Sequence, residues 1–158
     1  MTTAAVCAAL KTICNGVTGV TSDAVTLTIK SYDPPPASLD SVKLPAVYVF
    51  TGGAEYDAAR YGAENVEIVR EYSVNCAVLA ENAATPELRE KHCRPLLEAL
   101  RDRLLMYPSL GNVATVQQMT PISDTGVIVL PEYGGLYVGF TITIQTLEIV
   151  SRTYASNE

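Results

Sequence analysis

A regular alternation of apolar and polar residues near the C-terminus constrains the fold of this chain most strongly. Alternate positions of the segment 136–145 are apolar, namely Leu136, Val138, Phe140, Ile142 and Ile144. The positions between them are Tyr137, Gly139, Thr141, Thr143 and Gln145. Because successive side chains of a strand point to opposite faces of the sheet, this pattern predicts a long strand with one buried face.

A second β-rich run, residues 127–130, precedes this strand. The connection between the two contains Pro131, Tyr133, Gly134 and Gly135, and Pro and Gly favour turns. The C-terminal part of the chain is therefore predicted to form a long antiparallel β-hairpin.

The polar face of this hairpin is almost free of charge. Asp124 and Glu132 are the only charged residues between Leu104 and Leu147. Exposed strands usually carry charged side chains, which discourage pairing with other chains. An uncharged polar face instead indicates contact with another protein. We take four residues of this face as candidate contact residues: Tyr137, Thr141, Thr143 and Gln145.

The rest of the chain predicts two helices and further strands. Apolar periodicity and turn residues place them at 2–14 (helix), 24–30, 45–51 and 66–79 (strands), from Thr85 to about Leu104 (helix) and 113–119 (strand). We expect Gly52 and Gly53 to end the second strand and Pro95 to kink or divide the second helix. Leu97, Leu100 and Leu104 are its predicted apolar stripe.

The order of these elements predicts an α+β fold. We expect a mixed, mainly antiparallel sheet with two helices packed on one face, as a single domain over residues 1–150. Residues 151–158 are predicted to be a polar C-terminal tail.

The segment 54–65 is predicted to be a loop that is longer than most hairpin connections. It contains Tyr56, Arg60 and Tyr61, and Tyr and Arg dominate the energetics of protein interfaces. We expect these three residues to anchor a contact with a neighbouring subunit or partner. The alternative is a polar loop without any partner.

Composition excludes several classes of protein. A chain of 158 residues with 48% hydrophobic and 18% charged residues is typical of one globular domain. Its net charge of −6 argues against a surface that binds nucleic acid. The N-terminus lacks the basic region of a signal peptide, and no apolar run reaches the roughly 20 residues that span a membrane. We therefore expect a soluble intracellular chain whose four cysteines are reduced and buried.

The sequence contains no pattern that predicts a catalytic, metal or cofactor site. His92 and Cys93 are neighbours on the second predicted helix, where adjacent side chains point about 100° apart, so they do not form a dyad. Neither Gly52-Gly53 nor Gly134-Gly135 has the spacing of a phosphate-binding loop. A small cytosolic enzyme or ligand-binding domain that uses the His92–Cys93 region remains an open hypothesis.

Several segments resemble the tail terminator proteins of long-tailed bacteriophages, also called tail completion or minor tail proteins of the lambdoid type. The similarity covers residues 1 to about 150. It includes the N-terminal helix and the segments PAVYVF (45–50), NCAVL (75–79), TPELR (85–89), LLMYPSLG (104–111) and EYGGLYVGFTITI (132–144).

This resemblance implies a structural virion protein rather than an enzyme. Its subunits would form a hexameric ring that caps the tail tube, stops tube polymerisation and offers a docking surface to the head. The implied partners are further copies of the chain, the tail tube protein and a head-completion or neck protein. DNA would pass through the lumen without specific binding, and no membrane or cofactor is involved. The protein would occupy the tail or neck of the virion after assembly in the host cytoplasm. Another neck component, such as a head-closure or tail-to-head joining protein, is the nearest alternative.

Overall fold

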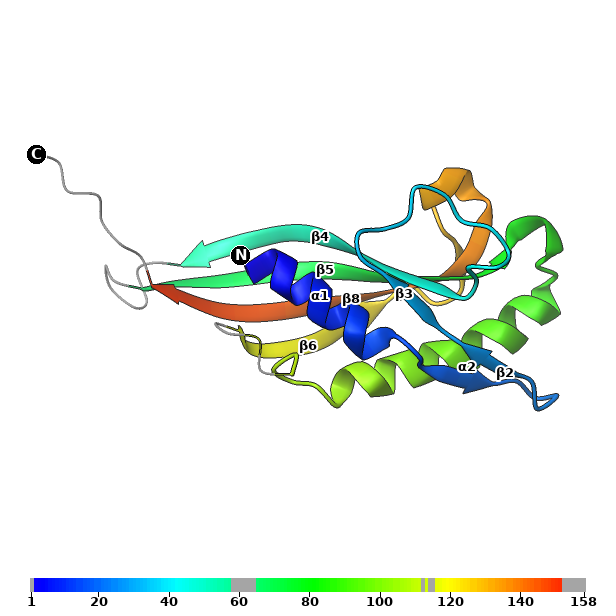
Figure 1. Cartoon of the computed structure of the whole chain (residues 1–158), viewed down its shortest axis with the longest axis horizontal. Coiled ribbons are helices and arrows are strands. Elements are labelled where there is room, and N and C mark those ends of the chain that lie inside the picture. The colour runs from blue at the N-terminus through cyan, green and yellow to red at the C-terminus, as the bar shows by residue number, and fades with distance from the viewer. Residues whose placement is uncertain (1, 58–64, 112, 114–115, 152–158) are drawn as a thin grey trace, which may run out of the picture.

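A computed structural model describes residues 2–57, 65–111, 113 and 116–151 (Figure 1). Two helices, α1 (Thr2–Cys14) and α2 (Pro86–Leu105), pack on one face of a long twisted sheet. The strands are β1 (Thr18–Val20), β2 (Thr26–Thr28), β3 (Lys30–Tyr32), β4 (Ala46–Asp57), β5 (Asn65–Ala80), β6 (Val116–Asp124), β7 (Ile128–Val129) and β8 (Tyr137–Ser151). Short 3-10 helices are η1 (Glu81–Ala83) and η2 (Glu132–Gly135). The predicted α+β fold class is confirmed.

The main sheet has the strand order β3-β4-β5-β8-β6, and β7 also pairs with β8. Each neighbouring pair in β4-β5-β8-β6 is antiparallel, whereas β3 runs parallel to β4. The small β1–β2 hairpin forms a separate sheet. β8 is central because it pairs with β5 along its whole length, from Tyr137 to Ser151. Ser151, the first residue of the predicted tail, belongs to β8, and residues 152–158 lie outside the described part of the chain.

The C-terminal hairpin is shorter than predicted. β7 contributes only Ile128 and Val129, which pair with Gly139 and Val138. The long partners of β8 are β5 and β6, whose own alternating residues match its pattern.

The main core lies between the helices and the sheet. The alternate residues of β8 from Val138 to Ile144 are buried there, as the sequence predicted. Leu136 precedes the strand and is exposed. The helices contribute Val6, Leu10, Ile13, Cys93, Leu96, Leu100 and Leu104. Leu97 lies at the margin of this core, because the stripe of α2 that faces the sheet runs through Leu96 instead.

α2 continues through Pro95 as one helix, so Pro95 does not divide it. The buried residues on both sides of Pro95 hold the helix against the sheet, and this packing offsets the hydrogen bond that Pro removes. β1 approaches α2 closely at this point, since a Cβ atom on Gly19 would lie 2.9 Å from the carbonyl carbon of Pro95.

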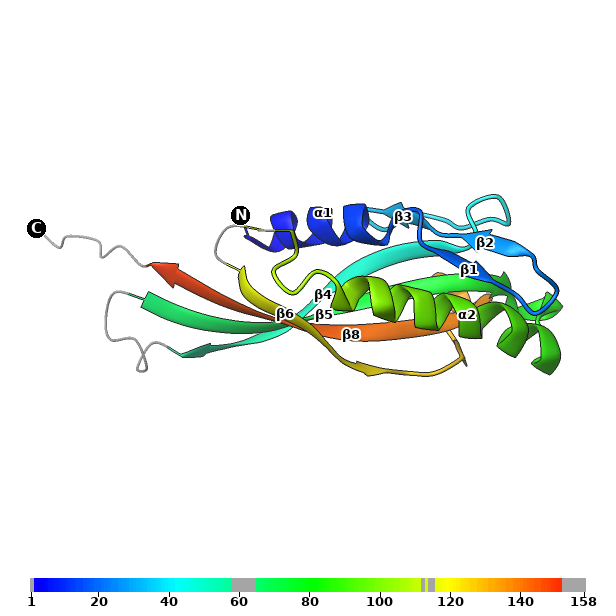
Figure 2. The same ribbon diagram turned by 90° about the horizontal axis from the view of Figure 1, so that it is seen from below.

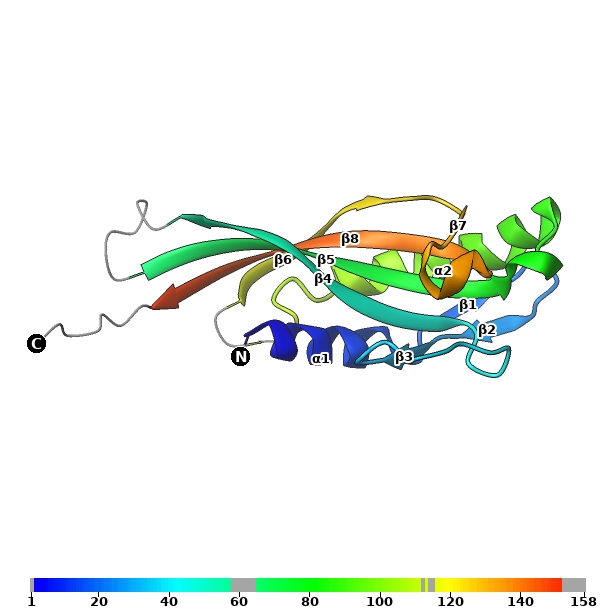
Figure 3. The same cartoon turned by 90° about the horizontal axis from the view of Figure 1, so that it is seen from above.

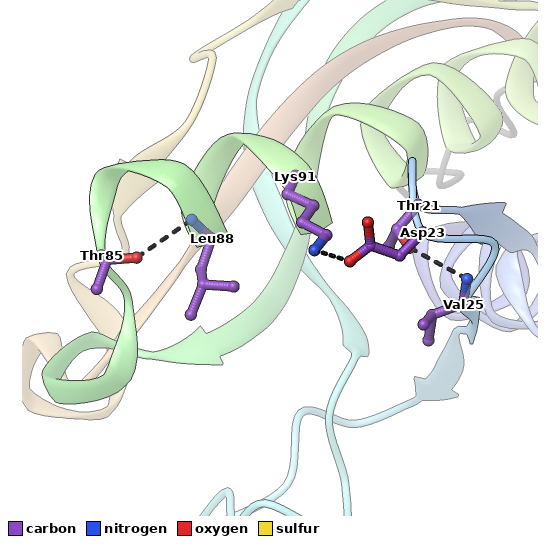
Figure 4. Close-up of polar contacts among 6 residues, drawn as sticks. All are labelled: Thr21, Asp23, Val25, Thr85, Leu88 and Lys91. Carbon is purple, nitrogen blue, oxygen red and sulfur yellow. Dashed lines mark hydrogen bonds and ion pairs between the residues drawn. The ribbon is translucent and has the colours of Figure 1, made fainter.

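Polar contacts fix the N-terminal half of α2 and the β1–β2 turn (Figure 4). The Thr85 hydroxyl accepts a hydrogen bond from the Leu88 N–H and so caps the start of α2. Lys91 forms an ion pair with Asp23 in the turn. The ion pair and the close approach at Gly19 hold the small hairpin on the helix.

β4 does not end at Gly52 and Gly53, and this prediction is wrong. A register shift between Thr51 and Ala54 forms a bulge, after which the strand continues to Asp57. A Cβ atom on Gly52 would lie 2.7 Å from the carbonyl oxygen of Glu71, so the close approach at the bulge requires glycine. Residues 54–57 and Asn65 of the predicted loop therefore belong to β4 and β5, and residues 58–64 lie outside the described part of the chain.

A second, smaller cluster covers one end of the opposite sheet face. It contains Leu39, Ala46, Tyr48, Ala77 and Leu130. The hydroxyls of Tyr133 and Tyr137 donate to the carbonyl oxygens of Pro36 and Leu39, which ties the segment 33–44 over this end. In Figure 3, η2 (orange) lies in front of the sheet and α2 (green) behind it. At the other end, β4, β5 and β8 extend beyond the N-terminus of α1 (Figure 2).

Candidate interaction surface

The uncovered part of the sheet face opposite the helices is the candidate site, and we call it the open face. Its central row lies on β8, where Thr141, Thr143 and Gln145 are half-buried and point away from the main core. Leu147 continues this row on β8, and the neighbouring strands add Phe50, Glu55, Val69, Glu71, Ser73, Asn75, Gln118, Thr120 and Ser123 to the face.

The open face is a ladder of cross-strand polar pairs. Thr141 lies opposite Asn75, and its hydroxyl donates to the Asn75 side-chain oxygen at 2.6 Å. Asn75 is buried and donates from Nδ2 to the carbonyl of Ser73 at 3.2 Å. Further along, Thr143 faces Ser73 and Gln145 faces Glu71. Among the described residues, no side-chain partner binds Thr143 or Gln145, so these two groups are available to another molecule.

Carboxylates extend the open face toward the end of the sheet that no helix covers. Glu71 lies beside Gln145, and Glu55 lies opposite Val69. Together with Gly53 and Ala54 these four residues line a hollow of about 300 Å³. The face is therefore uncharged along β8 but acidic along β5 and β4. The residue pattern of one strand does not show which strands lie beside it. The sequence signal for the acidic part of the open face was the polar row Glu67, Glu71, Ser73 and Asn75.

The predicted contact residues are only partly brought together. Thr141, Thr143 and Gln145 form one row on the open face. The Tyr137 hydroxyl is bonded to Leu39, so this residue belongs to the covered end of the sheet. Tyr56 lies on the helix side of β4, where it is 65% exposed and its hydroxyl accepts a hydrogen bond from Arg70 at 3.2 Å. Arg60 and Tyr61 lie outside the described residues.

A buried polar pair lies on the helix side of the sheet. Glu148 is 3% exposed and Tyr72 is fully buried, yet neither Glu148 Oε1 nor the Tyr72 hydroxyl has a hydrogen-bond partner among the described residues. Burial raises the pKa of Glu148, and the nearby guanidinium of Arg70 partly opposes this rise. Burial and the charge of Glu148 also raise the pKa of Tyr72. Nothing in the alternation of β8 indicated this acid, because Glu148 occupies a position that the pattern assigns to apolar residues.

Glu148→Gln is expected to stabilise the protein at neutral pH by about 1 kcal/mol, since it removes a poorly solvated charge. The folded chain retains the proton of Glu148 at pH values where the unfolded chain, with an ordinary pKa of 4.5, has lost it. The free energy of unfolding of the wild type therefore falls as pH rises from 4.5 through the raised pKa of Glu148, and it stays lower at higher pH. Below pH 4.5, Glu148 is protonated in both the folded and the unfolded chain and does not affect the free energy of unfolding. Urea unfolding at several pH values measures the difference. The exposed Glu98→Gln is the control, and parallel pH profiles for wild type and Glu148→Gln would contradict the assignment.

The cysteines have the environment of packed apolar residues. All four are buried and free. Burial raises the pKa of the Cys93 thiol to about 12, so it is protonated at neutral pH and is a poor nucleophile. The His92–Cys93 region therefore provides no activated thiol for the enzyme hypothesis.

Among the residues that the structure describes, no group of three or more His, Cys, Asp or Glu side chains is placed to hold a metal ion. Within the same part of the chain, no helix combines the length and apolar character needed to cross a bilayer.

No protein-family model matches the chain, and no curated protein matches it either.

Proposed function

We propose that this protein is a structural subunit of a phage tail, which assembles into a hexameric ring at the end of the tail tube. The ring stops tube polymerisation and offers a docking surface to the head or a neck protein. Support comes from the resemblance, whose segments fall in matching elements. PAVYVF leads into β4, NCAVL lies in β5, TPELR begins α2, and EYGGLYVGFTITI spans η2 and the first half of β8.

The observation that carries this proposal is the open face. Hydroxyl and amide side chains lose little free energy when a partner displaces their water, provided that they regain hydrogen bonds, whereas charged groups lose much more. The row Thr141, Thr143 and Gln145 thus suits a surface that is buried by assembly. The opposite face of the same strands carries the core, so contact here leaves the fold of the subunit intact.

The charge distribution supports passage of DNA without binding. With a net charge of −6, the subunit repels phosphate groups and releases few counterions on contact with DNA. A ring of such subunits would let a duplex slide through its lumen.

Thr143→Lys is expected to convert assembled rings to monomers, because it places an unpaired charge in the proposed contact. The free energy of unfolding of the monomer should change by less than about 0.5 kcal/mol, since Thr143 is not in the core. Light scattering over a concentration series, with negative-stain images, measures assembly in the presence and absence of purified tail tubes. Thr26→Lys, at an exposed position of β2, is the matched control.

Three results are informative. A wild-type protein that stays monomeric both alone and with tubes would refute the proposal. Assembly of Thr143→Lys at the wild-type concentration would show that the open face is not the contact. A ring that forms but does not bind tube ends would favour another neck component over a terminator.

A further inference from the structure

A groove of about 350 Å³ lies on the helix side of the sheet, between α1 and the C-terminal end of α2. Figure 1 shows these two segments beside each other, with α1 in blue and α2 in green. The residues that line it include Ala9, Thr12 and Ile13 of α1, Arg103 of α2, and Tyr107 and Leu110 just after α2. Ile13 and Leu110 are buried, whereas Met106, between Arg103 and Tyr107 in the chain, is 71% exposed. The groove is thus largely apolar, and it is separate from the open face.

Arg103 is the cation of this groove, and its charge is not compensated within the described chain. The other four cations of α2 all have partners, namely the Ala84 carbonyl for Arg89, Asp23 for Lys91, Glu90 for Arg94 and Asp102 for Arg101. Arg103 is half-buried, yet it forms neither an ion pair nor a side-chain hydrogen bond with any described residue. A guanidinium carries five N–H donors, so burial without a partner is costly.

The segments that line the groove supply no carboxylate for this charge. The sequence contains no Asp or Glu between residues 1 and 22 or between residues 103 and 123. The guanidinium lies near the interface between the helices, since its charge partly opposes the rise that burial causes in the pKa of Cys14. The carbonyl end of the α2 dipole favours a cation here but provides no counter-ion. Arg103 therefore remains a cation that an anionic group of another molecule would neutralise.

We propose that this groove binds a segment of a partner protein in which apolar side chains flank a carboxylate, with the carboxylate on Arg103. Arginine binds carboxylates through two parallel hydrogen bonds, and these are strongest where water is excluded. Tyr and Arg dominate the energetics of protein interfaces, and Met is enriched there, so Arg103, Met106 and Tyr107 favour a protein over a small amphiphile. The inference rests on the proposed function only in that the partner is another protein of the same assembly.

The first test selects binders from a yeast-displayed library of random peptides, each of about twelve residues, a length that can fill a groove between helices. Wild-type protein is the bait, and excess unlabelled Arg103→Met protein removes peptides that bind elsewhere. The enriched peptides are expected to carry Asp or Glu among Leu, Ile, Met and Phe. Enrichment of basic or uniformly polar peptides, or no enrichment at all, would overturn the proposal.

The second test measures the affinity of one enriched peptide by calorimetry. Arg103→Met is expected to weaken binding at least about tenfold, and so is replacement of the peptide's acid by its amide. The two changes together should weaken binding little more than either alone, because both remove the same contact. Arg101→Met changes the net charge equally at a cation that is paired with Asp102, so it is the matched control and is expected to bind as wild type does. Equal weakening by both variants would reduce the effect to general electrostatics and overturn the proposal.

Urea unfolding of the same variants tests for a merely structural role of Arg103. Arg103→Met is expected to unfold at a urea concentration no lower than that of wild type, because it removes a half-buried charge and keeps an apolar side chain. A lower midpoint than that of Arg101→Met would show that Arg103 stabilises the fold instead. Laurate that displaces the peptide and binds as tightly would show a site for amphiphiles, which also contradicts the proposal.

These outcomes separate from those of the ring proposal. Arg103→Met is expected to form rings on tail tubes as wild type does, because the groove is not part of the open face. Loss of rings in this variant would place a second copy of the chain in the groove, which retains the proposed function and overturns this inference. A wild-type protein that binds the peptide yet never assembles would do the reverse.

Discussion

Gly139→Ala is expected to lower the free energy of unfolding by more than about 3 kcal/mol, or to prevent folding altogether. A Cβ atom on Gly139 would lie 1.8 Å from the carbonyl oxygen of Cys76 and 3.2 Å from the Cα of Ala77. Both atoms belong to the backbone of β5 at the point where its register with β8 shifts. Neither strand can move aside, because the adjacent Phe140 and Cys76 are fully buried in the core.

The matched control is Gly53→Ala, which places the same methyl group on a strand where nothing lies within 4 Å. It is expected to be neutral or slightly stabilising, because alanine restricts the unfolded chain more than glycine does. Urea unfolding monitored by circular dichroism measures both variants. Equal stability of the two would mean that β5 and β8 do not approach each other closely at Gly139.

Leu100→Ala is expected to destabilise the protein by about 2–5 kcal/mol, the usual range for a large aliphatic side chain removed from a core. Leu100 is fully buried on the side of α2 that faces the sheet. Its loss leaves a cavity between the helix and the sheet, which the close-packed neighbours fill only partly.

Leu105→Ala deletes the same atoms near the end of the same helix, but Leu105 is 57% exposed. Its effect should stay within about 0.5 kcal/mol in the same denaturation experiment. A larger loss for Leu105→Ala than for Leu100→Ala would show that α2 packs through a different side.

The features that the sequence predicted well are those set by local periodicity. The alternation from Val138 to Ile144 identified β8 and its buried face, and the Thr85-Pro86 pair located the start of α2. The features it missed depend on residues that are distant in the chain. Gly52 and Gly53 look like a strand end, yet the neighbouring β5 converts them into a bulge.

The candidate site shows the same limit. The uncharged row on β8 could be predicted, because Thr141, Thr143 and Gln145 share one strand face. The acidic border could not, since it depends on the register that places Glu71 beside Gln145. The buried Glu148 was not predicted for a related reason. The alternation of β8 predicts an apolar residue at this position, and the burial of an acid there follows from the packing around it.

The central position of β8 also affects how the protein folds during synthesis. β8 follows every other described strand in the sequence, yet it lies between β5 and β6. The β4–β5 pair can form early, because its two strands are close in the chain. The other edge of β5 then stays unpaired until β8 has been synthesised. Until β8 emerges from the ribosome, β6 has no partner strand and the apolar face of β5 is only partly covered. Nascent chains of this topology expose an adhesive sheet edge, and a chaperone that shields it would raise the yield of folded subunits.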